Sequence, residues 1–130
     1  MQLTANNDTF GHQEGDRCLQ LIARTIADLV KRPGDMVARY GGEEFCLVLP
    51  DTDLEGALVL AKKLKEAVEA LKLQSANNTA SPYVTISLGV SCITPTGKII
   101  AEDLVYAADK ALYLAKQHGR NRIETWEADV

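Results

Sequence analysis

Two adjacent glycines, Gly41 and Gly42, separate two short runs of strand-forming residues, and they constrain the fold of this 130-residue chain more than any other stretch. Glycine adopts positive φ without steric cost, so the pair predicts the tip of a tight β-hairpin. Residues 36–40 before the tip predict a short strand. The unbroken apolar run 45–49 after it predicts a buried strand that returns antiparallel.

Two carboxylates, Glu43 and Glu44, directly follow the glycine tip. Adjacent carboxylates repel each other unless a positive charge lies between them, and a divalent cation is the usual solution. A solvated turn that happens to be acidic is the alternative, because Gly-Gly turns are common. The turn taken by itself leaves both interpretations open.

The composition favours one globular domain, with 46% hydrophobic residues, 25% charged residues and a net charge of −4. An acidic chain argues against nonspecific nucleic-acid binding, which needs a basic surface. Because no apolar run reaches membrane-spanning length and no signal-peptide pattern is present, we expect no membrane contact from this segment and a cytoplasmic location. The alternative is that the chain is the cytosolic output domain of a larger, membrane-bound protein. The three cysteines have no CxxC spacing and are expected to be buried free thiols: Cys18, Cys46 and Cys92.

Apolar residues at three- and four-residue spacing predict three helices, at about 15–31, 54–72 and 102–117. Pro33-Gly34 is expected to stop the first helix, and Gly119 is expected to cap the last one.

Strands and loops complete the predicted order. Residues 83–93 alternate between apolar and small polar side chains, which predicts a long strand with one buried face. Residues 122–126 predict a last short strand, and residues 1–12 are expected to form a loop. Helices alternating with a mostly antiparallel sheet predict an α+β fold of two layers.

The run from Gly41 to Phe45 resembles the signature of the diguanylate cyclase family, the GGDEF domains, in the variant with Glu at its third position. Residues 7–12, Gly15-Asp16, 108–116 and 119–121 resemble further motifs of the family and occur in its order. The resemblance covers nearly the whole chain and implies a single GGDEF domain over residues 1–130. The family fold is similar to a ferredoxin-like βαββαβ core, related to the palm of nucleotide cyclases and polymerases.

The amino terminus departs from the family, which begins this core with a strand ending in Asp-x-Asp-x-Phe-Lys. Counting back from Asn7, the Phe position falls on Leu3, the Lys position on Thr4 and the second Asp position on Met1. The first Asp would precede residue 1. We therefore expect the chain to lack the first strand and its metal-binding aspartate, and the sheet to be marginal as a monomer or completed by a neighbouring chain.

The resemblance implies that two GTP molecules are joined into cyclic di-GMP, as a 3′-hydroxyl attacks an α-phosphate and pyrophosphate leaves. This chemistry needs Mg²⁺ or Mn²⁺ held by carboxylates. Glu43 falls on the metal-binding position and is a candidate for activating the hydroxyl, and Glu44 is a second catalytic candidate. Gly41 and Gly42 fall among the substrate-binding positions.

Four further residues fall on substrate-binding positions of the family. Asn7 and Asp16 match the pair that reads the donor and acceptor edge of guanine. Lys116 and Arg120, four residues apart at the end of the last predicted helix, match the pair that binds the triphosphate. Helix capping by Asp16 and a basic helix end that complements the dipole are the alternatives.

Arg32 and Asp35, in the turn Arg32-Pro33-Gly34-Asp35, resemble the product-inhibition site of the family by their offset from the signature. Arginine can grip phosphate or the guanine edge, and aspartate can accept from guanine N1–H and its amine. An ion pair across a tight turn is the alternative.

The implied partners are GTP, cyclic di-GMP, a second protomer and an upstream sensor domain in a longer parent protein. A homodimer is expected because each protomer presents one GTP, and the two nucleotides must meet. The alternative function is a binding module that has lost synthesis and still binds cyclic di-GMP through Arg32 and Asp35. A scaffold with two vestigial nucleotide sites is the third hypothesis.

Overall fold

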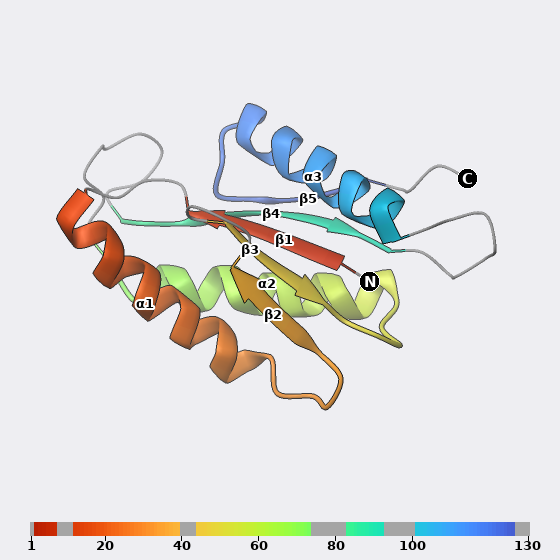
Figure 1. Cartoon of the computed structure of the whole chain (residues 1–130). Helices are drawn as coiled ribbons and strands as arrows, with labels where there is room; N and C mark the ends of the chain where they lie inside the picture. Colours follow the sequence, from red (N-terminus) through yellow and green to blue (C-terminus); the bar gives the residue numbers. More distant parts are fainter. Residues whose placement is uncertain (1, 8–11, 40–43, 74–82, 93–100, 127–130) are drawn as a thin grey trace.

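The computed structural model describes residues 2–7, 12–39, 44–73, 83–92 and 101–126; for 2–7, 12–16 and 101 it describes the backbone only. Figure 1 shows a sheet with helices packed on it. In chain order the elements are β1 (Gln2–Asn7), α1 (His12–Leu29), β2 (Met36–Arg39), β3 (Glu44–Val48), α2 (Leu54–Ala70), β4 (Ile86–Ser91), α3 (Ala101–Gln117) and β5 (Ile123–Thr125).

The strands form one sheet in the order β2-β3-β1-β4-β5. β1 is antiparallel to both of its neighbours, with Gln2 opposite Val48 of β3 and Ser91 of β4. The predicted hairpin is confirmed, because β2 and β3 pair antiparallel on either side of the glycine signature. The last strand is also confirmed, and β5 runs parallel to β4.

The expectation that the first strand is missing, and that residues 1–12 form a loop, is wrong. Residues 2–7 occupy the centre of the sheet, and α1 begins at His12, earlier than predicted. Gln2–Asn7 has little strand propensity of its own, but partners on both sides take up its backbone hydrogen-bonding groups, and such pairing outweighs local preference.

The centre of the sheet is therefore complete within one chain, which removes the reason for expecting a neighbour to fill it. What β1 lacks is a carboxylate, since its residues are Gln, Leu, Thr, Ala, Asn and Asn.

The main hydrophobic core lies between the sheet and the pair of helices α1 and α2. Its side chains come from all of these elements and are almost completely inaccessible to solvent. They include Ile22, Ile26, Leu47, Leu49, Leu64, Val68, Ile86, Leu88 and Val90.

Helix α3 packs on the opposite face of the sheet, so the predicted two-layer arrangement is wrong and the fold has three layers (Figure 1). The expected polar face of β4 is fully buried beneath this helix. Ser91 Oγ donates a hydrogen bond of 2.8 Å to the carbonyl of Leu104. Gly89 lies so near the backbone of α3 that a Cβ there would come within 2.3 Å of Ala108 O. Small residues on β4 thus permit close helix–sheet packing.

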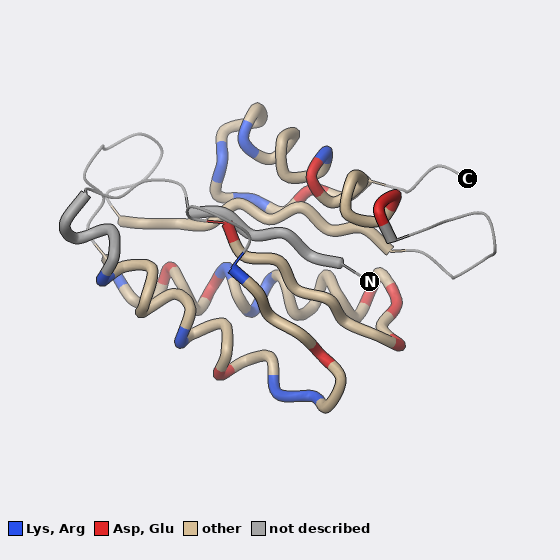
Figure 2. Tube along the Cα trace, viewed as in Figure 1, with Lys and Arg blue, Asp and Glu red and all other residues tan. Residues whose placement is uncertain are grey.

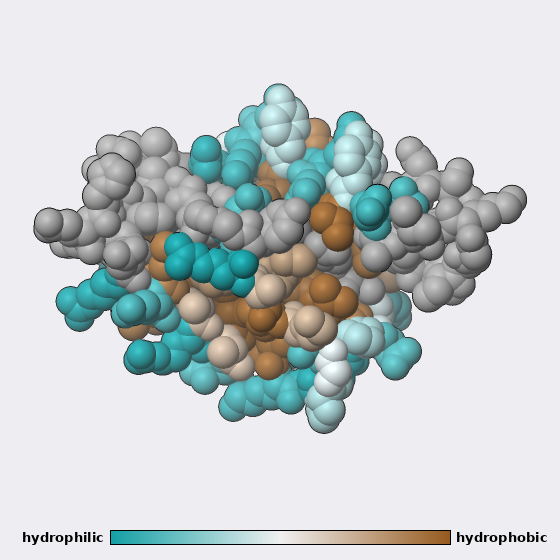
Figure 3. All heavy atoms as spheres, in the orientation of Figure 1, coloured by the Kyte–Doolittle hydropathy of each residue, from teal (hydrophilic) through white to brown (hydrophobic). Residues whose placement is uncertain are grey.

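The hairpin forms the open side of the sheet. All four residues of edge strand β2 are exposed, and exposed apolar side chains lie over β2 and β3 in Figure 3, including Met36 and Val48. The three cysteines form no disulfide, as predicted, but only Cys18 is buried, and Cys46 and Cys92 are partly exposed. Within the described segments, no helix is both long and apolar enough to cross a bilayer.

Candidate active site

The start of β3 directs two neighbouring side chains to opposite faces of the sheet, as strand geometry requires. Phe45 is buried in the core on the α1 side, and its partner across the hairpin is Arg39. Glu44 lines a pocket shared with α3. Glu44 and Phe45, the last two residues of the signature run 41–45, therefore line two different pockets, one on each face of the sheet.

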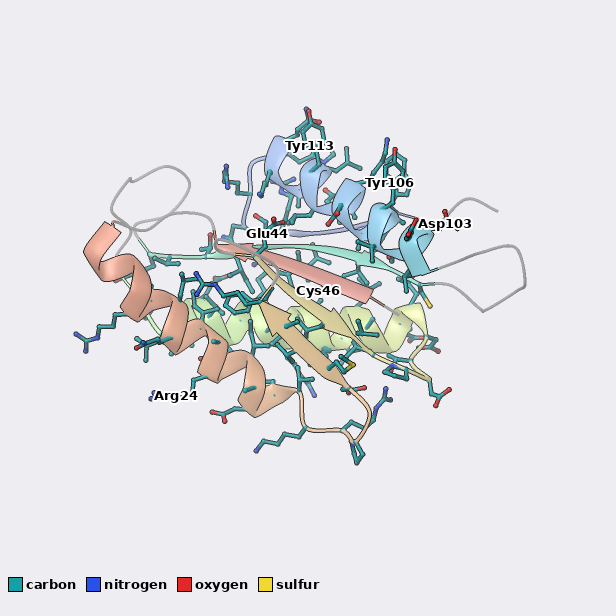
Figure 4. The ribbon with its side chains drawn as sticks, viewed as in Figure 1. Arg24, Glu44, Cys46, Asp103, Tyr106 and Tyr113 are labelled. Carbon is teal, nitrogen blue, oxygen red and sulfur yellow. The ribbon has the colours of Figure 1, made fainter. Side chains whose placement is uncertain are left out.

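The pocket on the α3 side has a volume of about 230 Å³ and is lined by Glu44, Asp109, Leu112, Tyr113 and Lys116. The four helical residues follow i, i+3, i+4, i+7 spacing, which places them on one stripe of α3. Figure 4 shows Glu44 at the beginning of β3 beside this helix. Two carboxylates and one ammonium group thus share a small pocket next to the signature.

Charge in and around this pocket is mixed. Partial burial raises the pKa of the Asp109 carboxyl above its usual value, although the side chain still reaches the surface. The Tyr113 hydroxyl accepts a hydrogen bond of 2.8 Å from Gln117 Nε2. Figure 2 shows basic residues at the last turn of α3 and in the segment leading to β5. The pocket therefore lies beside a local source of positive charge on an acidic chain.

Asp109→Asn is expected to raise the melting temperature slightly at pH 7, by about 2 °C. The raised pKa means that the folded state binds a proton more tightly than the unfolded state, so ionised Asp109 lowers stability at neutral pH. As the pH falls through the raised pKa, this cost disappears in the wild type. Thermal melts of both proteins at pH 7 and near the ordinary aspartate pKa of about 4 should show the difference shrinking. A difference that grows as the pH falls would contradict the assignment.

The second pocket has a volume of about 260 Å³ and lies between α1 and the hairpin. Its walls are Leu19, Gln20, Ala23, Arg39 and Phe45. Asp16 lies on α1 three residues before Leu19, about one turn nearer the amino end of the helix. Three of its five lining side chains are apolar, and Gln20 and Arg39 are polar.

Two of the predicted site residues, Asn7 and Glu44, lie at the end of the sheet from which β3 starts. Asn7 is the last residue of β1 and lies opposite Ile86, and the preceding Asn6 lies opposite Glu44. Asn7 and Glu44 are therefore brought to one end of neighbouring strands. Gly41, Gly42 and Glu43 lie outside the described residues.

Lys116 and Arg120 are arranged differently from the prediction. Because α3 ends at Gln117, Arg120 is not on the helix, and the expected one-turn spacing does not apply. Gly119, Arg120 and Asn121 all have positive φ, at 116°, 64° and 49°. Gly119 thus occupies the left-handed conformation expected of a helix cap. The turn is fixed by bonds from Arg120 N to Ala115 O (2.9 Å) and from Asn121 N to Ser87 Oγ (3.2 Å).

Arg32 and Asp35 form an ion pair, with 2.9 Å between Arg32 Nη2 and Asp35 Oδ1. The alternative raised by the sequence, an ion pair across a tight turn, is therefore present. This pair lies at the end of the hairpin away from the glycine signature, and the structure places it apart from both pockets.

Sequence reasoning assigned no role to Asp109 or Tyr113, although both line the pocket with Glu44. The signal in the sequence was that Asp109 and Tyr113 lie on one stripe of the last helix together with Lys116. This stripe runs beside the apolar stripe that packs on the sheet. Periodicity identifies such a stripe only as a half-exposed surface, because the strand that faces it comes from a distant part of the chain.

A magnesium ion fits the chemistry of the pocket on the α3 side. Mg²⁺ uses one or two carboxylates and takes its other ligands from water and substrate phosphates. Glu44 and Asp109 supply two carboxylates at one pocket, with Lys116 beside them for phosphate. Among the described residues, no group of three or more metal-ligating side chains occurs, so a metal ion here would depend on the nucleotide or on residues of the signature turn.

The chain is similar to curated proteins of one kind. It is 39% identical over 124 residues to "Diguanylate cyclase DosC" of Escherichia coli K12, and the alignment covers 95% of this chain and 26% of that protein. It is 38% identical over 117 residues to "Probable diguanylate cyclase DgcT" of the same strain, covering 90% of this chain and 25% of that protein. The chain therefore spans about a quarter of these relatives.

Solved structures of the same kind of domain also match this chain. The active GGEEF domain of a diguanylate cyclase from Vibrio cholerae matches with a TM-score of 0.82 and 28% identity, over 96% of this chain and 81% of that one. The GGDEF domain of DgcB from Caulobacter crescentus, in complex with c-di-GMP, matches with a TM-score of 0.81 and 26% identity, over 95% and 75%. The family model described as "Diguanylate cyclase, GGDEF domain" matches residues 2–122, and this chain belongs to that family.

Proposed function

We propose that this chain is a single diguanylate cyclase domain, which condenses two GTP molecules into cyclic di-GMP and releases pyrophosphate. The observation that carries the proposal is the pocket that joins Glu44 of the signature to Lys116 of α3. A carboxylate for metal and an ammonium group for phosphate are the two charges that nucleotidyl transfer needs at one place. The relatives are named for the same activity.

The two pockets divide the nucleotide between the faces of the sheet. The triphosphate lies on the α3 side, bound by Lys116 and by Arg120 from the adjoining turn. The base enters the pocket on the α1 side. Asp16 and Asn7, which the family resemblance assigns to the base, read the guanine edge. Gly41 and Gly42 contribute to substrate binding, since glycine permits a close approach of the backbone to a ligand.

Acidic residues at the signature prepare the attacking hydroxyl. Glu43 would hold the metal and activate the 3′-hydroxyl, and Glu44, which lines the pocket, would assist. A bound Mg²⁺ or Mn²⁺ supplies charge neutralisation for the triphosphate and lowers the pKa of the hydroxyl. Asp109 is a second acid that lines this pocket and could assist Glu44.

The reaction requires two protomers, because each binds one GTP and the hydroxyl of one nucleotide must reach the α-phosphate of the other. The active form is therefore a homodimer in the cytoplasm, and a sensor domain of a longer parent controls its assembly. The strand order through β4, with α1 and α2 on one face, supports a ferredoxin-like core of the cyclase-palm kind.

Cyclic di-GMP binding at Arg32 and Asp35 is the second proposed function. It serves as product inhibition in an active cyclase and as the whole function in a domain that has lost synthesis. The exposed guanidinium of Arg32 favours such a site, since its side chain is 47% accessible. A solved relative bound to c-di-GMP shows that the family can take this ligand.

Product formation tests the primary proposal. The purified chain is incubated with GTP and either Mg²⁺ or Mn²⁺, and cyclic di-GMP and pyrophosphate are measured by chromatography. Both products are expected in a fixed ratio, with no activity when a chelator is present. If neither product forms with either metal, synthesis by this chain is ruled out, and binding of cyclic di-GMP becomes the function to measure.

A further inference from the structure

Arg32 has hydrogen-bond partners in addition to Asp35, with which it forms an ion pair. Its Nη2 also donates to the hydroxyl of Thr52 at 2.5 Å and to the carbonyl of Pro50. Its Nε donates to the same Asp35 oxygen at 3.3 Å. Thr52 in turn donates to Pro50 O at 3.2 Å. A single guanidinium therefore joins two turns that are distant in the sequence.

These contacts close the base of the β2–β3 hairpin. Arg32 and Asp35 come from the turn between α1 and β2, whereas Pro50 and Thr52 come from the turn between β3 and α2. The second turn is itself well fixed. Asp53 caps α2 by accepting from Gly56 N at 2.8 Å, and Cys92 Sγ donates weakly to Thr52 O at 3.7 Å. Arg32 therefore binds a turn that is itself fixed by hydrogen bonds.

Asp35 is inaccessible while Arg32 is held in this way. Its side chain is only 8% exposed, and its Oδ1 already accepts from both Nε and Nη2 of Arg32. The two hydrogens of Nη2 are shared among three acceptors, so this nitrogen has none to offer a ligand. A ligand that is to bind the Asp35 carboxylate together with Nη2 of Arg32 must first displace these contacts.

From this geometry we infer that Thr52 is a positioning residue that keeps Arg32 in a closed position, and that it thereby sets the affinity for cyclic di-GMP. The inference rests on the proposed binding of that ligand at Arg32 and Asp35. The closed and open positions of Arg32 form a two-state equilibrium, and only the open state offers both groups. Because the closed contacts are lost on binding, they lower the apparent affinity by the fraction of protein that is closed.

Thr52→Val tests the inference, since valine keeps the shape of threonine and removes the hydroxyl, which accepts from Arg32 and donates to Pro50 O. We expect cyclic di-GMP, titrated by calorimetry, to bind Thr52→Val roughly three- to tenfold more tightly than the wild type. Thr52→Ser retains the hydroxyl and should bind as the wild type does. Thermal melts accompany each titration, because a purely structural role would lower the melting temperature of Thr52→Val without tightening binding.

Arg32→Ala separates the inference from the proposal on which it rests. Loss of binding in Arg32→Ala together with tighter binding in Thr52→Val supports both. Loss of binding in Arg32→Ala with unchanged or weaker binding in Thr52→Val overturns the closed-state inference and leaves the site in place. Unchanged binding in Arg32→Ala, or absence of binding in every protein tested, overturns the site and the inference together.

Discussion

Glu43→Gln is expected to lower the rate of cyclic di-GMP formation by at least about a hundredfold. Glutamine keeps the length of the side chain and removes its charge. The metal then loses an anionic ligand, and the 3′-hydroxyl loses the group proposed to activate it. Because both effects act on the transition state, the fall should appear in kcat and in kcat/KM to a similar extent.

The matched control is Glu66→Gln, which removes the same charge from an exposed position on α2, outside both pockets. It should form product at the wild-type rate. GTP binding, measured separately without turnover, should survive in Glu43→Gln, because the base pocket and Lys116 are intact. Retention of more than about a tenth of the activity in Glu43→Gln would remove Glu43 from the catalytic machinery.

Gly89→Ala is expected to destabilise the fold by about 3 kcal/mol or more, or to prevent folding. A Cβ at this position would lie 2.3 Å from Ala108 O, 2.3 Å from Leu112 N and 2.9 Å from the carbonyl carbon of Ala111. All three are backbone atoms, so no side chain can rotate away. Relief requires α3 to move off β4, which would also disrupt the pocket that Asp109 and Lys116 line.

Gly56→Ala provides the control for this prediction. Its added Cβ would meet only the side-chain atoms Asp53 Oδ1 and Thr52 Cγ2, each at 3.2 Å, and alanine favours the helical conformation of α2. Urea denaturation should show a change within about 1 kcal/mol for Gly56→Ala and a large loss for Gly89→Ala. Equal midpoints for the two variants would mean that α3 does not pack closely on β4.

Several elements were determined by the sequence. The periodicity of α1, α2 and α3, the glycine-centred hairpin and the positive φ of Gly119 all depend on neighbours within a few residues. Local backbone preference and one-sided hydrophobicity act over that range, so a pattern in the chain is sufficient to predict them.

The identity of the central strand was decided by the tertiary structure. Gln2–Asn7 contains no run of β-branched or aromatic residues, and its conformation comes from two flanking strands that the chain supplies far downstream. The same holds for the buried polar face of β4. Ser87, Gly89 and Ser91 read as a solvent face, yet their small size allows α3 to cover it.

The candidate site shows the same division. The sequence and its family resemblance supplied Glu44 and Lys116 as separate candidates, whereas Asp109 and Tyr113 join them only where α3 passes the start of β3. Arg32 and Asp35 were readable as a pair three residues apart, but Pro50 and Thr52 reach Arg32 from another turn. A sequence determines which side chains are available within one element; three-dimensional packing decides which of them meet, because such contacts join residues whose separation along the chain carries no local signal.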